Sequence, residues 1–120
     1  MNATKAITAL KQSIKFYERR LTYWLELKAE IELENGNRKT ADLKMCENNI
    51  QKYEIVLSDL ATIKRAINVN KPTVKIYGTA KNRNQMYKET FDALKDAGIN
   101  IGNIGVDDES IIITLPLKEA

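Results

Sequence analysis

The chain has 120 residues, enough for one folded domain or for a small domain that carries a helical arm. It contains one cysteine and no histidine, which excludes an intrachain disulfide, a cysteine-rich metal site and histidine-dependent catalysis. A net charge of +3 is too small to indicate nucleic acid by itself. We therefore expect a protein that is not an enzyme and holds no cofactor and no metal.

The sequence shows no signal for a membrane or for export. No apolar run reaches the roughly 18 residues that a membrane span requires. The first five residues lack the basic-then-apolar layout of a signal peptide. We expect a cytoplasmic protein. Abundant Lys, Asn and Ile are typical of an AT-rich genome and favour a low-GC bacterium or one of its phages.

Two long stretches show the alternating three-and-four spacing of a coiled-coil seam. The first consists of Ile7, Leu10, Ile14, Tyr17, Leu21, Trp24 and Ile31, with Lys28 in the one slot that is not apolar. The second consists of Leu43, Cys46, Ile50, Tyr53, Leu57, Leu60, Lys64 and Ile67. Between them Asn35-Gly36-Asn37 is a turn signal. The spacing predicts an antiparallel helical hairpin over residues 4–69.

The ends of both helices have candidate signals. Asn2 or Thr4 can cap the first helix, and Asn37 or Thr40 the second. Pro72 is expected to end the second helix, because the residue before a proline avoids helical geometry.

The hairpin has a predicted register. Residues that face each other across an antiparallel pair have numbers with a constant sum. That sum is 74 here, as for Ile31 with Leu43 and for Ile7 with Ile67. The register places Cys46 in the seam, as a small buried residue and not a nucleophile.

More apolar residues are present than one seam uses. They flank it and are the candidates for self-association: Phe16, Tyr23, Leu25, Leu27, Ile55, Val56 and Ile63. Either the C-terminal part of the chain folds over them, or a second copy covers them in a four-helix bundle. The arm is too long for the remaining residues to cover, so we favour a homodimer or a higher homo-oligomer.

The C-terminal third predicts a βαββ unit. Residues 73–77 alternate and are rich in β-branched side chains, which is typical of a strand. A helix is expected from Asn82 or Asn84 to about residue 97, with Gly98 as its stop. Further strands are expected over 99–106 and 111–117.

These elements predict an α+β fold with two domains, a coiled-coil hairpin over 1–70 and a βαββ domain over 71–120. The strand order 1-3-2 would form half of a ferredoxin-like unit. Ile111 to Ile113 are apolar on both faces, so we expect the base of the arm or a second subunit to cover the sheet face opposite its helix.

Charge is uneven along the hairpin. Residues 5–22 and 52–71 carry nine bases and three acids, whereas residues 23–51 carry four bases and six acids. Lys11, Lys15 and Arg19 form a like-charged row that destabilises its own helix by roughly 0.2–0.5 kcal/mol per pair. Such a row is either a solvated face or a site for an acidic partner. The candidates are Lys11, Lys15, Arg19, Arg20, Lys64, Arg65, Lys81 and Arg83.

Two shorter motifs have an ordinary structural reading beside a functional one. Residues 78–83 precede a helix, and their backbone N–H groups could hold a phosphate or carboxylate, although the Walker A ending is missing. Asp107-Asp108-Glu109 lacks the alternating ligand spacing of a calcium loop, so a polar turn is the simpler reading.

Three functions remain open from the sequence. The first is a homo-oligomeric interaction or adaptor protein, for example a phage or mobile-element accessory protein that binds and blocks a host factor. The second is a nucleic-acid-binding module that uses the basic base of the hairpin. The third is a sensor or sequestering protein for a small anionic ligand or nucleotide at residues 78–83.

Overall fold

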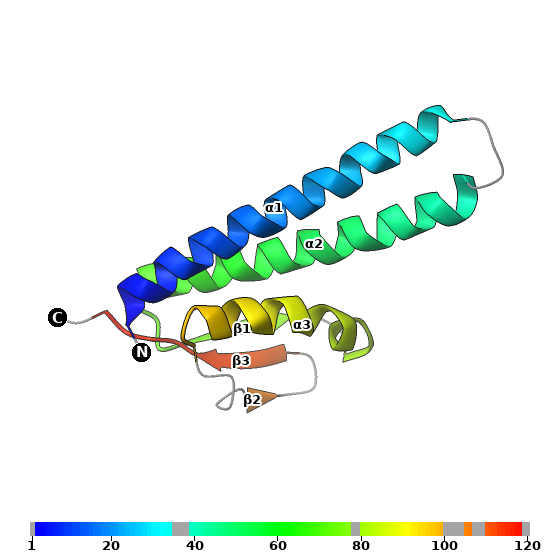
Figure 1. The fold of residues 1–120 in the computed structure, drawn as a ribbon. Coiled ribbons are helices and arrows are strands. Elements are labelled where there is room, and N and C mark those ends of the chain that lie inside the picture. The colour runs from blue at the N-terminus through cyan, green and yellow to red at the C-terminus, as the bar shows by residue number, and fades with distance from the viewer. Residues whose placement is uncertain (1, 35–38, 78–79, 100–104, 107–109, 119–120) are drawn as a thin grey trace.

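Two long helices pack against each other as an arm, and a third helix and a small antiparallel sheet lie at its base (Figure 1). The computed structural model describes residues 2–34, 39–77, 80–99, 105–106 and 110–118. The molecule is elongated, with extents of 60 × 30 × 19 Å. The fold is therefore α+β, as the sequence predicts.

The arm consists of α1 (Ala3–Leu33) and α2 (Lys39–Asn68). The side-chain oxygen of Asn2 accepts a hydrogen bond from the Lys5 N–H at 3.1 Å, so Asn2 is the cap of α1. The predicted turn residues, 35–37, lie outside the described part of the chain.

The second helix ends differently from the prediction. Asn70 adopts a left-handed backbone with a φ of 62°. Its N–H donates to the Ile67 carbonyl at 3.0 Å, and the Lys71 N–H donates to the Ala66 carbonyl at 2.9 Å. These two bonds form a Schellman motif, so Asn70 terminates α2 and Pro72 only follows the stop.

The third helix, α3 (Ala80–Asp96), ends by the same motif. Gly98 has a φ of 76°, which confirms it as the predicted stop. The Ile99 N–H donates to the Leu94 carbonyl at 2.9 Å, and the Ile99 side chain is buried in the core. Ile99 therefore belongs to the helix cap, and the prediction that it begins a strand is wrong.

The sheet is antiparallel and has the order β1-β3-β2, which is the order expected from the sequence. Its strands are β1 (Thr73–Tyr77), β2 (Gly105–Val106) and β3 (Ser110–Thr114). The register pairs Val74 with Ile113 and Ile76 with Ile111. A strand is predicted over residues 99–106, and within the described part of this segment residues 105–106 form it.

The two faces of the sheet differ sharply. Ile76, Ile111 and Ile113 are buried on one face, whereas Lys75 and Thr114 are exposed on the other. Both α3 and the arm lie on the buried side (Figure 1), and α2 contacts β1. The arm therefore does not cover the second face, and Ile112 on that face is only half-buried.

The apolar core is thick at the base of the arm and thin toward its tip. Leu10, Leu60, Leu94 and Ile113 are fully buried in one cluster that joins the arm, α3 and the sheet. A separate distal cluster has three buried residues, Ile31, Cys46 and Ile50. Cys46 is fully buried there, which confirms its predicted seam position.

Candidate interaction surfaces of the helical arm

The predicted basic row of α1 lies on the solvent-exposed face of the arm. Lys11, Lys15 and Arg19 are all exposed and recur every four residues. Among the described residues none of the three forms an ion pair. Arg20 is also exposed, and its guanidinium lies 5.4 Å from the centre of the Phe16 ring. The row is therefore a free cationic surface along α1.

The other predicted cations do not extend this row along α1. Lys64 is half-buried and Arg65 exposed, and both belong to α2. Lys81 and Arg83 fall in the first turns of α3, where side chains lie outside the described part of the structure.

A shallow hollow of about 290 Å³ opens on this exposed face of α1. Lys15, Glu18, Arg19 and Thr22 line it. Their positions are i, i+3, i+4 and i+7, which is the spacing of a hole that receives a side chain from a second helix. Two of the four lining side chains are cations and one, Glu18, is an acid, so the hollow has a net positive charge and suits an acidic side chain.

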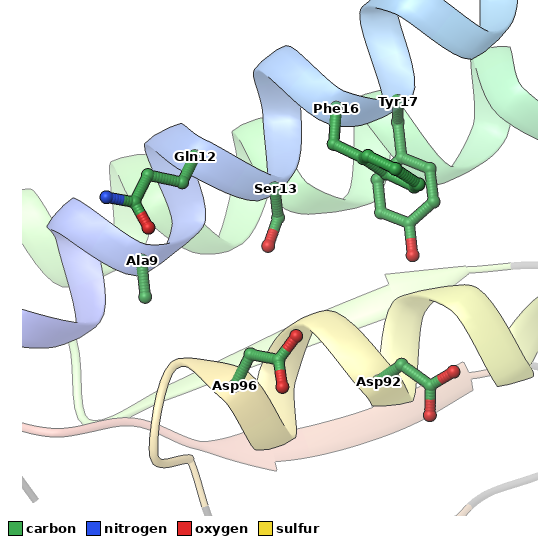
Figure 2. A pocket seen from close by; sticks show the side chains of 7 residues that line it. All are labelled: Ala9, Gln12, Ser13, Phe16, Tyr17, Asp92 and Asp96. Carbon is green, nitrogen blue, oxygen red and sulfur yellow. The ribbon is translucent and has the colours of Figure 1, made fainter.

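A larger groove of about 520 Å³ runs between α1 and α3 (Figure 2). One wall comes from α1 and the other from α3. The lining residues are Ala9, Gln12, Ser13, Phe16, Tyr17, Asp92 and Asp96. An aromatic ring opposite two carboxylates suits a positively charged group.

Sequence reasoning missed this groove. Asp92 and Asp96 stand four residues apart and share a face of α3, which is visible in the sequence. Their position opposite α1 depends on how α3 docks on the arm, which the sequence pattern does not indicate.

Tyr17 forms the inner edge of the groove and joins α1 to α3. Its hydroxyl donates a hydrogen bond to the backbone carbonyl of Glu89 at 3.1 Å. Its ring stacks on Tyr53 with centroids 5.9 Å apart, and the residue is only 7% exposed. Burial, and then the negative charges of Glu89 and Asp92, raise the pKa of Tyr17 from 10.0 to about 12.

A half-buried ion pair lies beside Tyr17. The Lys52 ammonium is 3.4 Å from the Glu89 carboxylate and 4.6 Å from the centre of the Tyr53 ring. It links α2 to α3, as the Tyr17 hydrogen bond links α1 to α3. Both helices of the arm are thus held to α3 at the same level.

The C-terminal part covers two of the seven predicted self-association residues. Val56 and Ile63 are fully buried in the main core, because α3 and β1 pack on that face of α2. They are not available to a second copy, and their assignment to a self-association surface is corrected accordingly. Leu27 and Ile55 are half-buried.

The other three predicted residues remain on the surface. Phe16 is 50% exposed, Tyr23 56% and Leu25 46%. Leu33 and Met45 are exposed in the distal half as well. Among the described elements, α1 and α2 alone form this distal half, so no third described element packs over its apolar side chains.

Two further findings bear on candidate sites. Within the described residues, no three potential ligands from His, Cys, Asp or Glu gather as a metal site would require. The acidic turn at 107–109 lies outside them. In the part of the chain that the structure covers, none of the helices combines the length and apolar character of a membrane span.

Comparison of the chain with protein-family models, with curated protein sequences and with solved structures gave no match.

Proposed function

We propose that this chain is a non-enzymatic interaction protein that self-associates through its helical arm. The exposed apolar surface of the distal half carries this proposal. Tyr23, Leu25, Leu33 and Met45 are each at least 45% exposed, and all four lie in the distal half of the arm, where α1 and α2 are the described elements. Several large exposed apolar side chains in one part of a molecule favour a protein contact there.

Light scattering behind size exclusion tests the proposal. We expect a mass above that of the 13.7 kDa monomer at micromolar concentration. The double variant Tyr23→Ser with Leu33→Ser should shift the protein toward the monomer. Leu117→Ser is the matched control, because Leu117 is 51% exposed but lies outside the arm. A wild-type monomer at every concentration tested would overturn the proposal.

A second function, binding of single-stranded nucleic acid, has one observation in its favour. Exposed Lys11, Lys15 and Arg19 run beside Phe16, whose ring is half-exposed and contacts Arg20. Single-stranded nucleic acids bind to rows of cations, which contact the phosphate backbone, and to accessible aromatic rings, on which the bases stack. Fluorescence anisotropy of a labelled oligonucleotide should then show an affinity that falls steeply with salt. Absence of binding at low salt removes this function.

The self-associated chain would in turn bind a different protein as its partner. A phage or mobile-element protein that blocks a host factor is one form of this proposal, and it rests on composition and size alone. A small anionic ligand at residues 78–83 stays a prediction, because residues 78 and 79 lie outside the described part.

A further inference from the structure

The exposed face of α1 carries a second charged row that mirrors the first. Glu26 and Glu30 follow on α1, and Glu34 at its C-cap, at the same four-residue spacing as Lys11, Lys15 and Arg19. Thr22 and Tyr23 lie between the two rows. Pairing the rows in opposite order gives Arg19 with Glu26, Lys15 with Glu30 and Lys11 with Glu34. Because both rows have the same spacing, the two numbers add to 45 in every pair.

A constant sum has a direct structural meaning. When two copies of one helix lie antiparallel, residues at the same level have numbers with a constant sum. A sum of 45 places the two-fold axis between Thr22 and Tyr23. Arg19 and Lys15 are then level with the exposed Glu26 and Glu30 of the other copy, while each copy alone has like charges in a row.

We propose that α1 is the dimer interface and that the second copy of α1 crosses it antiparallel, centred on Thr22 and Tyr23. This inference rests on the proposed self-association and specifies its geometry. The two-fold axis also brings the two copies of Tyr23, each 56% exposed, next to each other at the centre. The interface is thus a small aromatic centre with a charged row on each side.

The hollow on α1 supplies independent geometric support. Lys15, Glu18, Arg19 and Thr22 form a hole for one incoming side chain. In the proposed register Glu26 of the second copy is level with Arg19, at that hole. Its carboxylate would lie between the Lys15 and Arg19 cations, with which it forms charge-assisted hydrogen bonds. Glu26 and Arg19 are both exposed in the single chain, so both are accessible to this contact.

Charge reversal tests the register. Arg19→Glu or Glu26→Arg alone places like charges opposite each other twice per dimer, and we expect self-association to weaken by about tenfold or more. The double variant Arg19→Glu with Glu26→Arg restores opposite charges only in an antiparallel dimer, so its affinity should return to near the wild-type value. Lys88→Glu is the control, because Lys88 is exposed on α3.

Engineered cysteines give a second, independent readout of direction. Thr22 and Thr8 are both exposed on α1. In the proposed dimer the two copies of Thr22 are nearly level, and the two copies of Thr8 are about 44 Å apart along the helix. Thr22→Cys should form a disulfide-linked dimer and Thr8→Cys should not, whereas a parallel dimer would link both. The native chain is the control, since Cys46 is buried.

The outcomes separate this inference from the function on which it rests. If the protein self-associates but the double variant does not restore affinity, or if Thr8→Cys forms a disulfide-linked dimer, the proposed register is wrong. Self-association itself would still hold. A wild-type monomer at every concentration overturns both. A monomer that binds an oligonucleotide, and loses it on Arg19→Glu, assigns the basic row to phosphates instead.

Discussion

The hydroxyl of Tyr17 donates a hydrogen bond to the Glu89 carbonyl, and this 3.1 Å contact ties α1 to the middle of α3. We expect Tyr17→Phe to lower the free energy of unfolding by about 0.5–1.5 kcal/mol, the net value of one such bond. The loss should not be larger, because a carbonyl inside a helix also accepts its helical hydrogen bond. Urea denaturation below the concentration of self-association measures it, with Tyr23→Phe as an exposed control. An unchanged midpoint would contradict the expectation.

Stability should also respond to alkaline pH through Tyr17. Its pKa is raised from 10.0 to about 12 by burial and neighbouring negative charge, so the folded state favours the protonated hydroxyl. That contribution is fully present below pH 10 and is lost as the pH rises through about 12. Ultraviolet titration should show the late ionisation of Tyr17 as a separate step. Tyr17→Phe should remove this step and Tyr23→Phe should keep it.

The Lys52–Glu89 pair should show measurable coupling. Its two side chains are 25% and 23% exposed, so it is shielded more than a surface pair. We expect a double-mutant cycle with Lys52→Met and Glu89→Gln to give a coupling energy on the order of 1 kcal/mol. The matched control is the pair of Lys28 and Glu47, at 3.9 Å and with 34% and 59% exposure. Equal coupling in both pairs would argue against shielding as the cause.

Substitution along α2 distinguishes core residues from surface residues. Ile63 is fully buried between the arm and α3, so Ile63→Ala should cost roughly 2–5 kcal/mol. Ile55 is only half-buried, so Ile55→Ala should cost clearly less. Urea denaturation below the concentration of self-association compares them. Equal costs would show that α3 does not pack on Ile63.

The sequence predicts the elements better than their packing. Spacing of apolar residues indicates both long helices, and the β-branched run at 73–77 and Gly98 indicate a strand and a helix stop. These signals are local, so they do not depend on the rest of the chain. The left-handed turn at Asn70 is also a local feature, but Pro72, two residues later, is the stronger sequence signal and predicts the helix end in its place.

The packing of α3 on the arm follows from contacts between distant segments. Val56 and Ile63 belong to an apolar stripe of α2 that flanks the seam. The sequence pattern of this stripe is the same whether a second copy or α3 covers it. The groove of Asp92 and Asp96 likewise exists only once α3 lies beside α1. The apolar surplus of the arm was visible in the sequence, but its division between core and surface depends on this docking.

The thin distal core implies a gradient of local unfolding along the arm. Backbone amides near Ile31 and Cys46 are held by a cluster of three buried residues, whereas those near Leu10 and Leu60 belong to the large cluster. Amide hydrogen exchange should therefore be fastest toward the distal end and slowest beside α3. Above the association threshold, protection should rise selectively around Tyr23. The distal half of the arm would then become rigid only when a second copy of the chain is bound to it.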